Sequence, residues 1–153
     1  TLDATNNSIT NNQQGIYCEN GSDYNTIGYN NSWNNSNGNY SGELPDGTGN
    51  LTDVNINGTV CDVYKNISQN PLYLDPGSDN FQLEASSPNI DGGDPDSPQD
   101  NDGSIADIGY YNFDNYYIFF LDTFMYLANY LISLNNKLDR YKVAKYAPFD
   151  ICI

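Results

Sequence analysis

Histidine is absent from this 153-residue chain, and lysine and arginine together number only five. Its three cysteines, Cys18, Cys61 and Cys152, form no CxxC pair, so the ligand sets of zinc sites are missing. Cys18 and Cys61 could be joined as a disulfide or remain free thiols, and the sequence does not separate these alternatives. The length suffices for one domain with a real core.

Acidic residues dominate the charge, with 20 Asp and Glu giving a net charge of −15. Residues 1–113 hold 16 of these acids and a single base, Lys65. Such a body repels polyanions, which excludes nucleic acid as a partner and disfavours anionic lipid, while neutral glycans, cations and proteins remain open. Residues 114–153 carry four acids and four bases and are rich in Tyr, Phe, Leu and Ile.

The chain begins with Thr1 and shows neither an initiator methionine nor a signal peptide. We therefore expect a fragment or processed C-terminal portion of a longer protein, in which the lack of a targeting signal says little.

Two asparagine-rich stretches form a repeat, "NNSITNN" at 6–12 and "NNSWNN" at 30–35, with an offset of 24 residues from Asn6 to Asn30. Short alternating runs lie between them, bounded by Asn, Gly and Ser, which tolerate tight turns. This spacing predicts a coil of short parallel strands with asparagines stacked at the turns. The alternative is a disordered, low-complexity segment. The inward positions are expected to be Ile9, Ile16, Ile27 and Trp33.

After the repeat, residues 36–50 are expected to form a long loop, and residues 54–64, "VNINGTVCDVY", to return as a strand. The alternation in that strand predicts four buried side chains: Val54, Ile56, Val60 and Val63. Prolines in the extended pieces at 70–76 and 81–91 favour edge or terminal strands.

The run "NPLYLDPGSDNFQLEASSPNIDGGDPDSPQDNDGSIADIGYY" at 70–111, with the asparagine-rich stretches before it, resembles the C-terminal end of right-handed parallel β-helix repeat proteins. These belong to the pectin-lyase-like superfamily of secreted bacterial and archaeal surface proteins. The departures are Asn70, where that family usually has Asp, and Tyr110, where it usually has Ala. The resemblance covers residues 1–111 and implies an all-β solenoid fragment with a loop cap at an extracellular or cell-surface location.

The acidic stretch "SSPNIDGGDPDSPQDNDGSIADIGYY", residues 86–111, invites a calcium hypothesis. An EF-type loop aligned on Gly103 would place Pro98 at its first ligand position and Gly109 at its last, so this loop type is excluded. A looser oxygen cage could still bind Ca²⁺ through four carboxylates, Asp94, Asp96, Asp100 and Asp102. No cofactor is required.

Catalysis by this stretch is disfavoured. β-Helix lyases resemble one another in using a basic residue as the proton acceptor, and residues 1–113 offer only Lys65. The simpler hypothesis is a structural cap, with Ile90, Ile105 and Ile108 plugging the last turn of the coil. Asp91 and Asp107 would accept main-chain N–H groups at its bends.

The segment from 112 to 153 forms a second region, an apolar tail with helical periodicity. One narrow polar stripe holds Asp122, Asn129, Ser133, Asn136, Lys137 and Arg140. The tail could pack as an amphipathic helix, contact a membrane through residues 116–138, span it, or be a translation artefact. Asp122 and Asn129 weaken the spanning alternative.

These patterns predict a non-catalytic structural or glycan-binding portion of a surface protein. The alternatives are the C-terminal part of a polysaccharide lyase or glycosidase whose active-site turns lie upstream, and a membrane-anchoring module acting through the tail. Five aromatic residues are candidates for stacking on neutral sugar rings: Tyr17, Tyr24, Tyr29, Trp33 and Tyr40.

Overall fold

The computed structural model describes residues 3–19, 26–114 and 123–136. The chain divides into two compact units, Thr1–Asp114 and Asn115–Ile153. In the second unit, residues 123–136 form an α-helix whose side chains are exposed. Among the described residues, no helix has the length and apolar character needed to cross a membrane.

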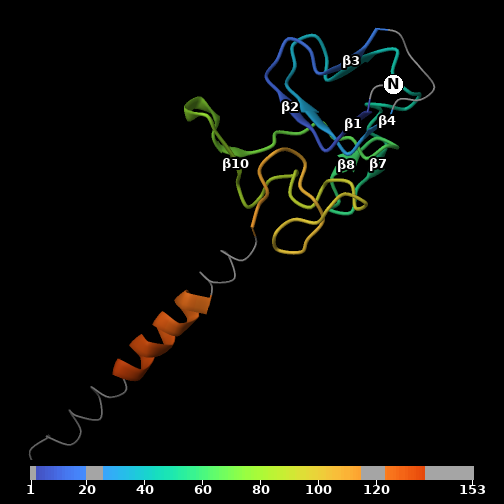
Figure 1. The fold of residues 1–153 in the computed structure, drawn as a ribbon. Coiled ribbons are helices and arrows are strands. Elements are labelled where there is room, and N and C mark those ends of the chain that lie inside the picture. Colours follow the sequence, from blue (N-terminus) through green and yellow to red (C-terminus); the bar gives the residue numbers. More distant parts are fainter. Residues whose placement is uncertain (1–2, 20–25, 115–122, 137–153) are drawn as a thin grey trace, which may run out of the picture. The chain divides into compact units, whose positions relative to one another are not determined.

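The first unit consists of short strands in small sheets (Figure 1). Three parallel pairs hold it together: β1 (Asp3–Thr5) with β4 (Thr26–Gly28), β2 (Ser8–Thr10) with β5 (Asn31–Trp33), and β3 (Ile16–Cys18) with β6 (Tyr40–Gly42). The chain therefore passes the same three positions twice in the same order and direction. We call residues 3–18 the first pass and residues 26–42 the second pass. β6 lies within the range 36–50 that was expected to be a loop.

The register of these pairs differs from the 24-residue repeat read from the sequence. Ser8 lies opposite Asn31 and Thr10 opposite Trp33, an offset of 23, and the offset becomes 24 only between β3 and β6. A one-residue change of register moves a side chain to the other face of a sheet. Ile9 is consequently opposite Ser32, and Trp33, predicted to point inward, is half-buried and lines a groove.

The predicted stacking of asparagines at the turns is confirmed. Asn7 donates its main-chain N–H to Oδ1 of Asn30 at 2.9 Å, and Asn30 donates to Oδ1 of Asn66 at 3.0 Å. A second series runs from Asn12 to Oδ1 of Asn35 at 3.0 Å. The residues that precede the asparagines of the first series have left-handed backbones: Asn6, Tyr29 and Lys65.

The chain makes a third pass around Ile67. This residue forms a parallel β-bridge with Asn31 and an antiparallel β-bridge with Cys61. Cys61 belongs to β8 (Val60–Cys61), which pairs with β7 (Asp53–Val54). Among the described residues the resulting order is β2, β5, Ile67, β8, β7, with β2 at one end.

The burial predicted for residues 54–64 is wrong. The four apolar residues expected inside are 45–78 % exposed: Val54, Ile56, Val60 and Val63. The buried residues are Asn55, Cys61 and Asp62. Asn55 Oδ1 accepts the N–H groups of Asn57 and Thr59, and Asp62 Oδ1 accepts those of two later turn residues. Because Asn55 and Asp62 point inward to accept these main-chain N–H groups, the apolar residues that alternate with them face solvent.

Beyond the third pass, β9 (Tyr73–Asp75), a 3₁₀ turn at Pro76–Ser78 and β10 (Asn80–Leu83) form an antiparallel hairpin (green in Figure 1). Residues 84–114 contain neither helix nor strand. Ile16 and Ile27 are buried as predicted, whereas Ile9 is half-buried.

The acidic segment packs against β2 and β5 through Asn89. Ser8, Asn31 and Ile67 lie at matching positions and face the same side. The side-chain nitrogen of Asn31, Nδ2, donates to Oδ1 of Asn89 at 2.6 Å. Ile108 is buried in one cluster with Ile67 and Cys61. Two residues predicted as plugs, Ile90 and Ile105, are only half-buried.

Candidate binding grooves

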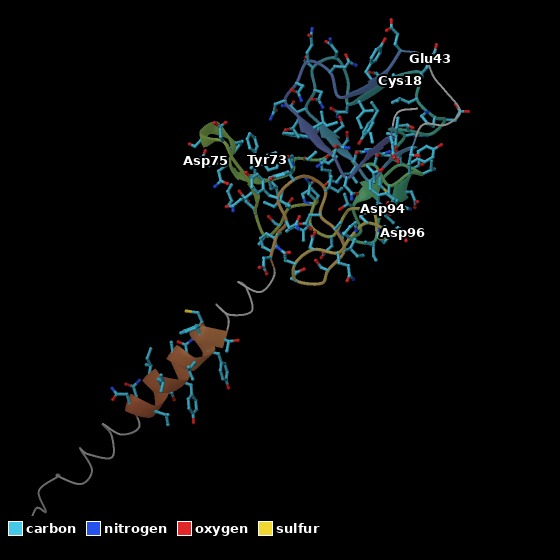
Figure 2. All side chains as sticks on the ribbon, in the orientation of Figure 1. Cys18, Glu43, Tyr73, Asp75, Asp94 and Asp96 are labelled. Atoms are coloured by element: carbon cyan, nitrogen blue, oxygen red, sulfur yellow. The ribbon has the colours of Figure 1, made fainter. Side chains whose placement is uncertain are left out.

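The four calcium candidates occupy two turns of the acidic segment. Asp94 Oδ1 accepts the N–H of Asp96 at 3.0 Å, and Figure 2 shows these two residues as neighbours. Asp102 Oδ1 accepts the N–H and hydroxyl of Ser104 at 3.0 and 2.6 Å. In the part of the chain that the structure describes, no three Asp, Glu, Cys or His side chains come close enough to hold a metal ion. Calcium binding stays a prediction.

The carboxylates that the fold does bring together are Asp100 and Asp107. Asp107 is 3 % exposed, and its two oxygens accept the N–H groups of Asp91 at 2.8 Å and Phe113 at 2.5 Å. Asp100 Oδ2 in turn accepts the N–H of Asp107 at 3.1 Å. The predicted bonding by Asp107 is thus confirmed, whereas Asp91 Oδ1 is buried without a hydrogen-bond partner, contrary to prediction.

Burial raises the pKa of Asp107 to about 7, against the ordinary 3.8, and the nearby Asp100 and Asp91 carboxylates act in the same direction. Burial likewise raises the pKa of Asp100. Since both lie inside the segment, this pair serves to hold the bends together.

The base that a lyase would need is not near this pair. Lys65 forms an ion pair with Asp53, and both side chains are partly exposed.

Cys18 and Cys61 are not joined as a disulfide in the structure. Cys61 is wholly buried, and burial raises its thiol pKa.

Two grooves with mainly neutral linings are the candidate binding sites. The first, the Trp33 groove, has a volume of about 740 Å³ and lies between the second and third passes and the start of the acidic segment. Trp33 forms one wall, and amide and hydroxyl side chains of Asn57, Gln69, Asn70 and Ser86 form much of the rest. Asp91 is its one acidic lining residue.

The second, the edge groove, has a volume of about 680 Å³ and follows β2. Its floor contains Asn7, Ser8 and Thr10. Its walls are the β9–β10 hairpin, through Tyr73 and Phe81, and the end of the acidic segment at 108–111. Figure 2 shows Tyr73 on the hairpin, and its hydroxyl lies 2.6 Å from Oγ of Ser8.

Among the aromatic residues predicted to stack on sugars that the structure describes, Tyr17, Tyr29, Trp33 and Tyr40, only Trp33 lines one of these two grooves. The Tyr40 hydroxyl lies 2.8 Å from the Ile67 carbonyl oxygen, and burial raises the pKa of Tyr40 well above the usual range. Tyr17 is exposed on β3, Tyr29 sits at a turn, and Tyr24 lies outside the described residues. The edge-groove aromatics Tyr73, Phe81, Tyr110 and Tyr111 were not singled out by the sequence, although the run "YLDPGSDNF" has strand–turn–strand composition.

Comparisons of this chain with protein-family models, with curated proteins and with solved structures gave no match.

Proposed function

We propose that the first unit is the C-terminal part of an extracellular, right-handed parallel β-helix and is a non-catalytic module that binds neutral glycans. Three parallel strand pairs at offsets of 23 or 24 residues support the coil. Two series of stacked asparagines support it further, because each series joins equivalent turns of successive passes.

The Trp33 groove carries the binding proposal. Sugar rings present apolar C–H faces and hydroxyl edges, so they are bound by aromatic faces flanked by amide and hydroxyl groups. Trp33 beside Asn57, Gln69 and Asn70 offers this combination. A chain of net charge −15 with one acid in the groove favours an uncharged glycan over a uronate or sulfated one.

Trp33 is the single tryptophan of the chain, so its fluorescence reports the groove directly. Titration of the full chain with neutral oligosaccharides, such as glucan, mannan and galactan fragments, should shift and saturate this emission, whereas oligogalacturonate should not. A glycan array should show the same selectivity. Trp33→Ala should abolish retention on the array, and Tyr17→Ala, which changes an exposed tyrosine outside the grooves, should leave it intact. A saturable response to uronates alone would contradict the proposal.

The two alternatives remain predictions. A lyase or glycosidase site would require catalytic residues outside the described part of this chain. Membrane contact through residues 116–138 falls partly outside the described residues; within them, Phe124, Tyr126 and Leu131 are more than half exposed. That exposed apolar surface favours contact with a membrane or partner over a solvated helix.

A further inference from the structure

One triplet motif recurs along the first unit, an asparagine followed two positions later by serine or threonine. Eight asparagines begin such a triplet, none with proline in the middle: Asn6, Asn20, Asn30, Asn34, Asn39, Asn50, Asn57 and Asn66. This motif is the acceptor of N-linked glycosylation, which joins the asparagine side-chain nitrogen to a sugar at an accessible surface loop. Asn20 lies outside the described residues, and the structure distinguishes among the other seven.

Four of these asparagines are occupied by the fold. Each is buried or half-buried, and its side-chain nitrogen, Nδ2, donates a hydrogen bond of 2.8–3.1 Å to another segment: Asn6, Asn30, Asn39 and Asn66. Asn30 and Asn66 are wholly enclosed. An enzyme could reach these nitrogens only after local unfolding, so the folded chain protects them.

Two further asparagines, Asn34 and Asn57, are exposed but tied to other segments. Nδ2 of Asn34 donates to the first pass at 2.7 Å, and Nδ2 of Asn57 donates to the acidic segment at 2.6 Å. Their triplets are held through the main chain as well. The N–H of Ser36 donates to the first pass, and the N–H of Thr59 donates to Oδ1 of Asn55. Exposure alone therefore does not make these two nitrogens available.

Asn50 is neither enclosed nor tied. It is exposed, as are Leu51 and Thr52 after it, and the triplet forms neither helix nor strand. Its side-chain amide makes no hydrogen bond with any described residue, and the triplet's own hydrogen bonds are local. The Asn50 N–H donates to the Gly47 carbonyl at 3.1 Å, and the Thr52 hydroxyl lies 3.4 Å from the Asn50 carbonyl oxygen. The triplet can thus enter an active site without breaking a hydrogen bond to a distant segment.

Apolar side chains lie exposed beside this triplet. Leu51 is its middle residue, and Val54 and Val60 are opposite each other in β7 and β8. The turn before the triplet lies against Val63, since a Cβ atom on Gly47 would be 2.9 Å from Cγ2 of Val63. These leucine and valine side chains are 36–56 % exposed. Exposed apolar surface favours a covering partner, and the C–H faces of a glycan attached to the triplet would provide one.

We propose that Asn50 is an N-glycosylation site, modified on the folded chain by an oligosaccharyltransferase that uses a lipid-linked oligosaccharide. In this reaction Nδ2 of Asn50 forms a bond to the anomeric carbon of the first sugar. The bond from that carbon to the lipid phosphate breaks, the phosphate leaves with the electron pair, and Nδ2 releases one proton to the solvent. The inference rests on the extracellular location proposed above and does not depend on glycan binding by the Trp33 groove.

The test is transfer in vitro to the purified, folded full chain. A single-subunit oligosaccharyltransferase that accepts Asn-x-Ser/Thr is supplied with its lipid-linked oligosaccharide, and the product is followed by intact mass and glycopeptide mapping. A glycan should be added at Asn50 at least about 10-fold faster than at any other described triplet, since the others must first open locally. Asn50→Gln and Thr52→Ala should abolish the fast transfer. Asn57→Gln, which changes the other Asn-x-Thr triplet, should not.

Two peptides separate the effect of the sequence from that of the fold. GTGNLTD, residues 47–53, and VNINGTV, residues 54–60, carry the motif without tertiary contacts, so both should accept the glycan at comparable rates. Failure of the second peptide alone would overturn the structural argument, because sequence and not the fold would then select Asn50.

The proposal is also overturned if the folded chain stays unmodified, or if Asn34 or Asn57 reacts as fast as Asn50. Because the transfer is carried out in vitro and involves neither groove, such a result would count against the acceptor alone. The extracellular location and glycan binding beside Trp33 would keep their own tests.

Discussion

At the scale of single residues, Asp107 shows how the acidic segment is held. Its carboxyl group is almost fully enclosed, next to Asp100 and Asp91, and still accepts two main-chain N–H groups. Those bonds favour the charged form, but burial outweighs them and raises the pKa of Asp107 to about 7. The crowded acids that suggested a cation site therefore include at least one that folding keeps protonated at mildly acidic pH.

Stability should consequently fall as pH rises from about 4 to about 7. The folded state keeps the Asp107 proton up to about pH 7, whereas the unfolded chain releases it near the ordinary value of 3.8. Between these values the folded state binds more protons, so a rise in pH favours unfolding, by at most about 4 kcal/mol. Urea unfolding at pH 5 and pH 8 should show this loss, and Asp107→Asn should reduce it. An identical loss in the variant would show that other groups cause it.

At the scale of elements, the turns rather than the strands organise the first unit. The strands are two to four residues long, too short to specify their partners by side-chain pattern alone. Asn30 instead joins three levels of the chain: it accepts from Asn7, donates to Asn66, and donates through Nδ2 to the carbonyl of Ala4 at 2.8 Å. Because Asn30 is wholly buried, each of these groups depends on it for a partner.

Asn30→Ala should lower the free energy of unfolding by about 2–4 kcal/mol, since several buried donors and acceptors lose their partner together. Asn37→Ala, which replaces an exposed asparagine two residues beyond the stretch 30–35, should change it by less than about 0.5 kcal/mol. Urea titrations followed by Trp33 fluorescence measure both. Equal effects of the two substitutions would mean that the stacked hydrogen bonds of Asn30 add nothing to the free energy of unfolding.

At the scale of the whole molecule, charge is the dominant property. Residues 1–113 carry a net charge of −15, and their single base is already paired with Asp53. Like charges at this density repel one another in the compact state and disfavour polyanionic partners. The Trp33 groove is lined by a single acid, Asp91, which is why the glycan proposal concerns an uncharged ligand.

Raising NaCl from about 10 mM to about 500 mM should therefore raise the melting temperature, because salt screens repulsion between exposed charges. Circular dichroism at the two concentrations provides the measurement. An equal osmolality of an uncharged solute serves as the control for general solvent effects. A lower melting temperature in salt would indicate that ion pairs, and not repulsion, dominate the surface electrostatics.

Much of the local structure was predictable from composition. Asparagines and glycines between short apolar runs indicated turns and strands, and the stacking of asparagines followed from their repetition. The wrong predictions concern faces and register. Val54 and Ile56 alternate as buried residues do, yet a period of two is the same for an inward and an outward face. The edge groove was missed because its walls come from segments more than 60 residues away from its floor.

By itself, the sequence determined that this protein is acidic, built of short strands and tight turns, and joined to an apolar helical tail. Only the tertiary structure decided that the offset of β2 from β5 is 23 residues, that Trp33 faces a groove, and that Ile108 packs with Cys61 and Ile67. The reason is physical. Turn preferences act within a few residues, whereas register and burial are set by hydrogen bonds such as Asn31 to Asn89, whose partners are 58 positions apart.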